Sequence, residues 1–549
     1  MDHRPRPSQN RGLIEYSIER WRLLRPLSRL GLGISRLPPK ATTVGAITCR
    51  SEAMPKLIGG AENRPLGAPL GCDRLAAAAT PSLLEPGWFS SAGRERAKQG
   101  SMTTIRQQRI QTAGSGTFGL LGSQRFGPLF AAQFLSAFND NAVKNALVLM
   151  IAYSSDAASQ KSAEILIPLA GGLFILPFFL CSATAGQLAD QLDKAWLIRL
   201  IKLTEIGLMM VAAAGVLLGS TTALLAVLLI MGIEAAFFGP LKYAILPDLL
   251  PLGELVLGNA LIEAGTFVAI LLGTIAGVLI AGRHGAVWVA GLIMAVALAA
   301  WATSLLIPRI GPAAPEIRPE WNLFAATRRV IREAAREKIP FHSILGITWF
   351  WLAGAVYLSQ FPAYVRFSLG GKETVVTLLL SIFTVGIAIG SLLCSRILGG
   401  RISARTVPWG AFGIGLFSID LWLASPAGGN GRALAGVGPF LAVPAHWRIV
   451  VDFLGIAVSG GIFIVPLYVL LQAASPRAHR ARAIAANNVV NAAGMVIAAL
   501  ATMAVIAAGI SVPGLFLLIG AATLIVAVWF WRLLPSLQLA PIACEAETL

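Results

Sequence analysis

The sequence predicts an all-α, polytopic membrane protein with twelve transmembrane helices in two six-helix bundles. Hydrophobic residues make up 56% of the 549 residues and charged residues only 13%, against about 25% charged residues in soluble domains. From about residue 127, apolar segments of about 20 residues follow one another, which is the length a helix needs to cross the bilayer core. Backbone polar groups have no partner in lipid, so these segments are expected to be helices.

The predicted spans form an N-terminal bundle over 126–307 and a C-terminal bundle over 341–534, followed by a tail at 535–549. The spans themselves are placed at residues 127–153, 164–186, 195–219, 222–243, 255–281, 285–307, 341–362, 373–396, 407–425, 449–472, 483–510 and 513–533.

A basic N-terminal extension, residues 1–125, precedes the spans. It holds 19 Lys and Arg against 8 Asp and Glu, which accounts for +11 of the formal net charge of +17. Because the membrane part carries only the small remainder, the charge does not indicate nucleic-acid binding. Met102 opens a short polar segment before the first span, and we expect it to be the native start; a disordered basic tail is the alternative.

Basic residues predict the orientation of the spans. The loops on the side of both termini, counted with their helix ends, hold 18 Lys and Arg and the opposite loops six, so both termini are expected to be cytoplasmic. The longest connection on that side is 308–340, and its segment 321–338 has the pattern of an amphipathic helix. This helix is expected either to lie on anionic lipid headgroups or to be a solvated linker.

A short internal repeat supports two related halves. The segment FFGPLKYAILPDLLP at 237–251 has a counterpart, FIVPLYVLLQAASP, at 463–476. A parallel duplication of six spans resembles the major facilitator superfamily.

Ionisable and amide groups inside the apolar spans are the candidate substrate-binding or gating residues, because such groups are costly in hydrocarbon. Asp140 and Lys144 lie four residues apart and are expected to form an ion pair on one helix face, although a purely structural polar seam would give the same pattern. No catalytic motif or Cys/His metal pattern occurs, so neither an enzyme nor a metal or cofactor is expected. The candidate residues are Asn139, Asp140, Asn141, Lys144, Glu205, Glu234, Lys242 and Glu263.

A charged loop follows the second span. Its sequence GQLADQLDK, from Gly186 to Lys194, resembles the loop signature of the major facilitator superfamily, G-x-L-A-D-R-x-G-R. Gly186 would permit close helix approach, and Asp190 would accept hydrogen bonds at the N-terminus of a neighbouring helix, as a conformational latch that includes Lys194. Gln191 and Asp193 depart from the signature, which predicts a weaker charge network.

Two longer stretches resemble a more specific family. QFLSAFNDNAVKNAL at 133–147 and the segment 237–265 are similar to the lysophospholipid transporter family and to the membrane domain of bifunctional acyltransferase–acyl-ACP synthetase proteins. The resemblance implies movement of lysophospholipids from the outer to the inner leaflet of the bacterial inner membrane, with Asp140 and Lys242 engaging the headgroup or gating. Reacylation would need a separate acyltransferase as a partner.

Two other functions remain open from the sequence. A proton-coupled exporter of drugs or other amphiphilic molecules would use Asp140, Glu205, Glu234 or Glu263 as the titrating carboxylate, since burial favours the protonated form. A non-transporting membrane anchor that recruits an acyltransferase is the third.

Overall fold

The computed structural model describes residues 116–152, 157–283, 285–426 and 434–537, and their regular structure is helical. The all-α prediction is therefore confirmed. The segment 1–101 and the candidate start Met102 lie outside the described residues.

Twelve of the described helices have 18 or more residues. Six precede the linker segment: α4 (Gly127–Ala152), α5 (Ala157–Gln191), α6 (Lys194–Leu217), α7 (Thr221–Ala244), α9 (Leu252–Arg283) and α10 (Ala286–Leu305). Six follow it: α12 (Lys338–Ala363), α13 (Glu373–Leu398), α14 (Val407–Ala424), α16 (Pro444–Ala474), α17 (Arg480–Ala507) and α18 (Val512–Leu533).

Within the described ranges, eleven helices are long and apolar enough to cross a membrane. The prediction of twelve spans differs at α4, which has the length of a span at 26 residues but not the composition. Asn139, Asp140, Asn141, Lys144 and Asn145 fall within it. The polar residues that make α4 a candidate site are therefore also what distinguishes it from the other spans.

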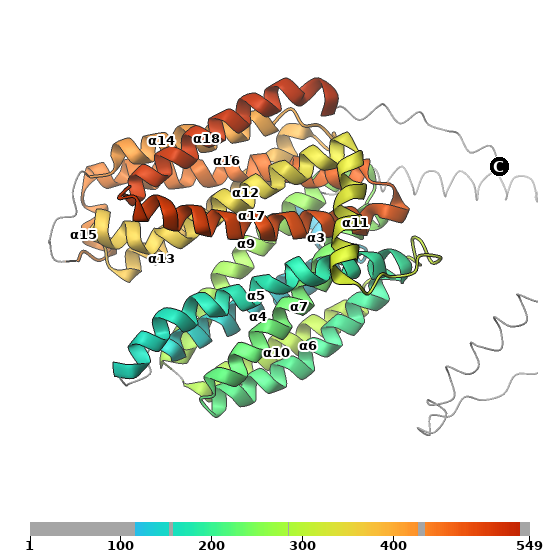
Figure 1. Ribbon diagram of the computed structural model, residues 1–549, viewed down its shortest axis with the longest axis horizontal. Coiled ribbons are helices and arrows are strands. Elements are labelled where there is room, and N and C mark those ends of the chain that lie inside the picture. Colours follow the sequence, from blue (N-terminus) through green and yellow to red (C-terminus); the bar gives the residue numbers. More distant parts are fainter. Residues whose placement is uncertain (1–115, 153–156, 284, 427–433, 538–549) are drawn as a thin grey trace, which may run out of the picture. The chain divides into compact units, whose positions relative to one another are not determined.

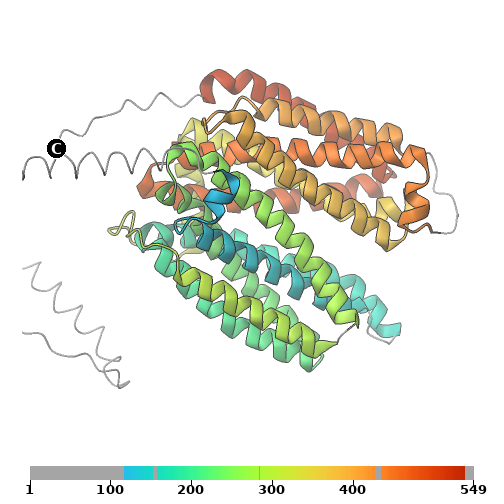
Figure 2. The same cartoon turned by 180° about the vertical axis from the view of Figure 1, so that it is seen from behind.

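The six helices before the linker and the six after it gather in two groups that run roughly side by side (Figure 1). On one face α5 contacts α17, and on the reverse face α9 runs beside α13 (Figure 2). Helix α11 (Leu323–Arg336) crosses the ends of α5 and α17 at one end of the bundle (Figure 1). We call this end, which also carries the start of α6 and of α17, the linker end.

Close backbone packing joins α4 to α9. A Cβ atom added to Gly273 would collide with the backbone carbonyl of Phe138, and one added to Gly277 with that of Ala142. Glycine is required at these positions because any side chain would push α4 away from α9. The packing fixes the position of the polar stretch of α4 in the bundle.

Helix α11 is attached to the bundle by small apolar residues. Ala326, Val330 and Ala334 are buried against α5 and α17, whereas Trp321 and Phe324 are 73% and 75% exposed. The face with which α11 packs on the bundle therefore carries small apolar residues and not the aromatic ones.

Asp193 joins two segments at the linker end. Its carboxylate caps α6 by accepting a hydrogen bond from Trp196 N at 2.7 Å, and it also accepts from Ile310 N at 3.0 Å and Gly311 N at 2.6 Å. Partial burial opposes its ionisation, but these backbone donors prevail and hold the pKa of Asp193 below its ordinary value. Asp193, one of the two residues that depart from the loop signature, therefore connects the segment after α10 to the start of α6.

Replacing Asp193 tests this contact. We expect Asp193→Ala to lower the free energy of unfolding by about 1 kcal/mol, the usual effect of losing a helix cap, and Asp193→Asn to lose less because its oxygen still accepts. Since the folded-state pKa lies below the unfolded one, the stabilisation should be present at neutral pH and disappear as the pH falls through the folded-state pKa. Thermal unfolding of the purified variants against pH measures this, and an unchanged melting temperature for Asp193→Ala at neutral pH would contradict it.

Candidate functional site

A buried cluster of charged side chains, in which the central ammonium group is paired with carboxylates, lies between α4, α6 and α7. Lys202 is only 1% exposed, and its Nζ atom lies 2.7 Å from Glu205 Oε2 and 2.9 Å from Glu234 Oε1. Nζ also donates to Ser136 Oγ at 2.5 Å and lies 4.2 Å from the ring centre of Phe238. Two carboxylates, one hydroxyl group and one aromatic ring therefore surround this ammonium group.

The polar side chains of α4 complete this buried cluster. Ser136 Oγ donates to Glu205 Oε2 at 3.0 Å, and Asn139 Nδ2 contacts Glu205 Oε1 at 3.4 Å and Ile293 O at 3.2 Å. Three predicted site residues, Asn139, Glu205 and Glu234, thus share one centre. That centre, Lys202, was missed in the sequence, although its spacing of three residues from Glu205 in an apolar helix was a usable signal.

Asp140, Lys144 and Lys242 have a different environment, because each is partly exposed. None of the ion pairs formed by the described residues includes any of the three. The expected pair of Asp140 with Lys144 is not formed, since Lys144 Nζ donates to Asn141 Oδ1 at 3.0 Å instead. Lys242 Nζ lies over the ring of Tyr243, 4.9 Å from its centre. We call these three residues the open charges.

An aromatic contact next to Lys242 connects the two halves. The rings of Tyr243 on α7 and Tyr468 on α16 are stacked, with centres 4.3 Å apart and planes 7° apart. Tyr243 donates to Glu263 Oε1 at 2.5 Å, and Trp351 Nε1 donates to Tyr468 at 3.2 Å. Glu263, the last of the predicted carboxylates, is thus fully buried beneath this aromatic contact.

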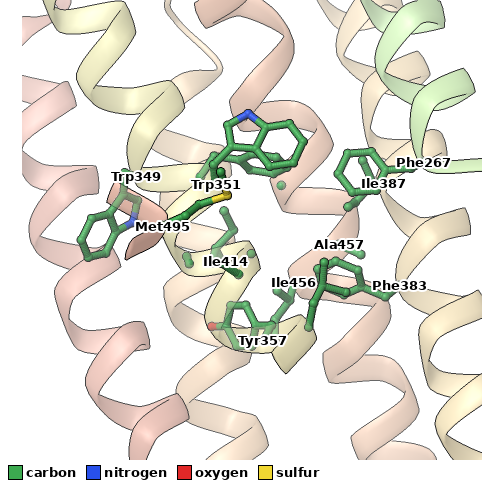
Figure 3. Close-up of a pocket in the computed structure, with 16 residues that line it drawn as sticks. Phe267, Trp349, Trp351, Tyr357, Phe383, Ile387, Ile414, Ile456, Ala457 and Met495 are labelled. Atoms are coloured by element: carbon green, nitrogen blue, oxygen red, sulfur yellow. The ribbon is translucent and has the colours of Figure 1, made fainter. Parts of the chain in front are cut away.

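An apolar cavity of about 130 Å³ lies mainly among the helices of the second half, and Trp351 is one of the residues that line it. Figure 3 shows Trp351, Tyr357, Ile387 and Ala457 around the open space. Phe267 of α9 also lines it, with its ring stacked 6.1 Å from that of Trp351. A chain of aromatic contacts therefore leads from the open charge Lys242 to an apolar cavity.

At the linker end, Asp190 connects α5 to the start of α17. Its carboxylate accepts from Ala481 N at 3.1 Å, from Arg482 N at 3.3 Å and from Arg482 Nε at 3.2 Å. A carboxylate at a helix N-terminus is stabilised by the backbone donors and by the helix dipole. Gly186, one turn earlier, faces Ala485 so closely that a Cβ atom there would collide with it.

A second carboxylate at the same end, that of Asp248, forms ion pairs with three basic residues. It lies 3.2 Å from Lys194 Nζ, 3.2 Å from Arg480 Nη1 and 3.4 Å from Arg477 Nε. Lys194, predicted as part of the latch, is thus paired with Asp248. It helps to position this carboxylate, which also pairs with Arg477 and Arg480 of the second half.

Arg482 also connects this end to the linker helix, because its Nη1 atom lies 3.0 Å from Glu333 Oε2 on α11. Asp248, Arg480, Arg482 and Glu333 were not identified as site residues. In the sequence Arg480 and Arg482 contribute only to the count of basic residues on the side of both termini, and the repeat segment that contains Asp248 does not indicate the partners of this carboxylate.

The chain is similar in sequence to proteins named as lysophospholipid transporters. The chain is 29% identical over 420 residues to the lysophospholipid transporter LplT of Escherichia coli O7:K1 (strain IAI39 / ExPEC), covering 75% of this chain and 97% of the relative. The lysophospholipid transporter LplT of Shigella sonnei (strain Ss046) matches at the same identity and coverage.

The fold is also similar to that of solved transporters. A crystal structure of the Escherichia coli fucose:proton symporter FucP superimposes with a TM-score of 0.57 at 14% identity, covering 76% of this chain and 98% of that one. The human organic anion transporter MFSD10 gives 0.55 at 14% identity, with 76% and 99% coverage. At these identities the likeness concerns the fold alone.

The assignment to a family rests on the larger part of the chain. Residues 129–443 match the Major Facilitator Superfamily, and the helical architecture agrees with that match. The chain belongs to the major facilitator superfamily of membrane transporters.

Proposed function

We propose that this transporter moves lysophospholipids from the outer to the inner leaflet of the bacterial inner membrane by alternating access. The observation that carries the proposal is the set of open charges, one of which, Lys242, is connected through Tyr243 and Tyr468 to Trp351 at an apolar cavity. A lysophospholipid has a charged headgroup and one acyl chain, so it needs both environments. The similarity to the two LplT proteins supports this choice of substrate.

The open charges suit a phospholipid headgroup. The ammonium groups of Lys144 and Lys242 attract phosphate, and the carboxylate of Asp140 attracts the amine of ethanolamine. Because these groups have no ion-pair partner among the described residues, the headgroup does not have to displace one. In contrast, Lys202 is occupied by Glu205 and Glu234, and its role in this proposal is to hold α4, α6 and α7 together.

Alternating access requires the linker end to open. The contacts of Asp190 and Asp248 with the start of α17 hold this end closed. Following the positive-inside rule, we assign the linker end to the cytoplasm, so these contacts would break as the lipid is released there. A separate acyltransferase would then reacylate the product.

Removal of the open charges tests the substrate site. We expect Lys242→Gln and Asp140→Asn to lower uptake of labelled lysophosphatidylethanolamine into spheroplasts by about tenfold or more, as for loss of a hydrogen bond to a charged group. Their thermal stability should be nearly unchanged. The exposed Lys372→Gln and Glu373→Gln serve as matched controls, and normal uptake by both site variants would contradict the proposal.

Lys202→Met provides the contrast. It leaves the buried carboxylates of Glu205 and Glu234 without their ammonium partner, which costs about 3–5 kcal/mol for a buried pair. We therefore expect loss of folded protein rather than selective loss of uptake.

The same assay separates the proposal from the two alternatives. Uptake that stays normal with a protonophore agrees with lipid flipping without proton coupling. No uptake, together with raised drug sensitivity of a deletion strain, would instead favour a proton-coupled exporter. Intact reacylation in the Asp140→Asn and Lys242→Gln variants would favour a membrane anchor for an acyltransferase.

The latch is tested by Asp190→Asn, which removes the charge that holds the start of α17. We expect a longer distance between spin labels placed at the linker ends of α5 and α17, measured by double electron–electron resonance in nanodiscs. Asp420→Asn is the matched control, because Asp420 pairs with Arg448 within the second half. An identical distance distribution in Asp190→Asn and the unmodified chain would exclude the latch role.

A further inference from the structure

Helix α11 carries more arginines than its own ion pairs use. Arg328, Arg329, Arg332 and Arg336 are exposed, and among the ion pairs of the described residues only Arg329 takes part, with Glu320 at 3.5 Å. The acidic residue Glu333 on the same helix is already bound to Arg482. Three arginines thus have no acidic partner in the part of the chain that the structure describes.

These arginines converge on one surface. Arg328, Arg332 and Arg336 follow one another at intervals of four residues, which places them along one side of the helix. Together with Arg329 they line a groove of about 340 Å³ at the side of α11. The groove is also lined by Glu320 and Glu333, whose carboxylates are paired with Arg329 and Arg482. Guanidinium groups spaced in this way suit phosphate oxygens, which they can bind in a bidentate manner.

The position of α11 brings this surface to the edge of the membrane. The buried residues Ala326, Val330 and Ala334 hold the helix across the ends of α5 and α17 (Figure 1). These ends are also the ends of two helices that are long and apolar enough to cross a membrane. Trp321 and Phe324 extend from the start of the helix, and both are about three-quarters exposed. Aromatic side chains beside basic ones are typical of a helix that lies in the headgroup region.

We propose that this surface, formed by Arg328, Arg332 and Arg336 with Trp321 and Phe324, binds anionic phospholipids of the leaflet at the linker end. The arginines contact the headgroup phosphate, and the two aromatic side chains enter the adjoining interface. A soluble acidic protein would satisfy the arginines, but it would not account for exposed aromatic side chains held at the level where the spans end. This site is separate from the open charges, and its existence does not depend on which substrate is transported.

The test is a titration of the purified full-length chain with phosphatidylglycerol and with phosphatidylcholine, with bound lipid counted by native mass spectrometry. We expect R328Q/R332Q/R336Q to weaken phosphatidylglycerol binding by about a hundredfold, since each arginine near an anionic surface contributes about fivefold. Hydrogen exchange of residues 323–336 in nanodiscs locates the effect: phosphatidylglycerol should slow the exchange in the unmodified chain and not in this variant.

The matched control is R396Q/R401Q/R405Q, which removes the same charge from exposed residues at the linker end of α13 and the loop after it. It should weaken phosphatidylglycerol binding less than R328Q/R332Q/R336Q does, because it leaves the groove of α11 intact. Equal loss in both triple variants would mean a general charge effect and overturn the proposal. Protection of α11 by inorganic phosphate alone, or only by a cytosolic extract, would assign the surface to a free anion or to a soluble partner and would also overturn it.

Discussion

The structure depends on the high cost of leaving a charge without a partner at the depth of the bilayer. Lys202 illustrates how this cost is met, because two carboxylates, a hydroxyl group and an aromatic ring surround one ammonium group. The cluster joins α4, α6 and α7 and thereby positions the adjacent polar residues of α4. Asp140, Lys144 and Lys242 are partly exposed and lack ion pairs among the described residues, which sets them apart as groups available to a ligand.

The contacts between the halves are of two kinds, and they differ in how easily they can separate. At the linker end they are ionic: Arg477 is about half exposed where it meets Asp248, whereas Asp190 and Arg482 are buried. The other kind consists of the stacked rings of Tyr243 and Tyr468 and the reciprocal hydrogen bonds of the buried Asn259 with Gln472, at 2.9 and 2.7 Å. Water can replace the first kind when the end opens, whereas the second kind must find new partners within the protein. We therefore expect the linker end to open during the proposed cycle.

The helices could be predicted closely from apolar length. The span expected at 407–425 is Val407–Ala424, and the one expected at 127–153 is Gly127–Ala152. The helix expected at 164–186 extends over Ala157–Gln191, because its polar ends continue the helix without contributing to the apolar run. The short helices α8 (Leu246–Leu249) and α15 (Val437–Leu441) were not predicted, since a single turn leaves no periodic pattern.

The candidate site could be predicted only as far as residue type allows. An ionisable residue in an apolar helix is visible in the sequence, and Asp140 and Lys242 were found in this way. Which partner it takes depends on distances between helices, so the role of Lys202 at the centre of the buried cluster was missed. The expected pair of Asp140 with Lys144 was wrong for a related reason. Several polar side chains lie within reach of the Lys144 ammonium group, and in the structure it donates a hydrogen bond to Asn141.

A structure of the chain with bound lysophosphatidylethanolamine tests the account most directly. It predicts the headgroup phosphate beside the Nζ atoms of Lys144 and Lys242, the amine towards Asp140, and the acyl chain in the cavity beside Trp351, with the Lys202 cluster unchanged. A headgroup bound to Lys202 in place of Glu205 or Glu234, or an acyl chain outside the apolar cavity, would contradict the division between structural and open charges.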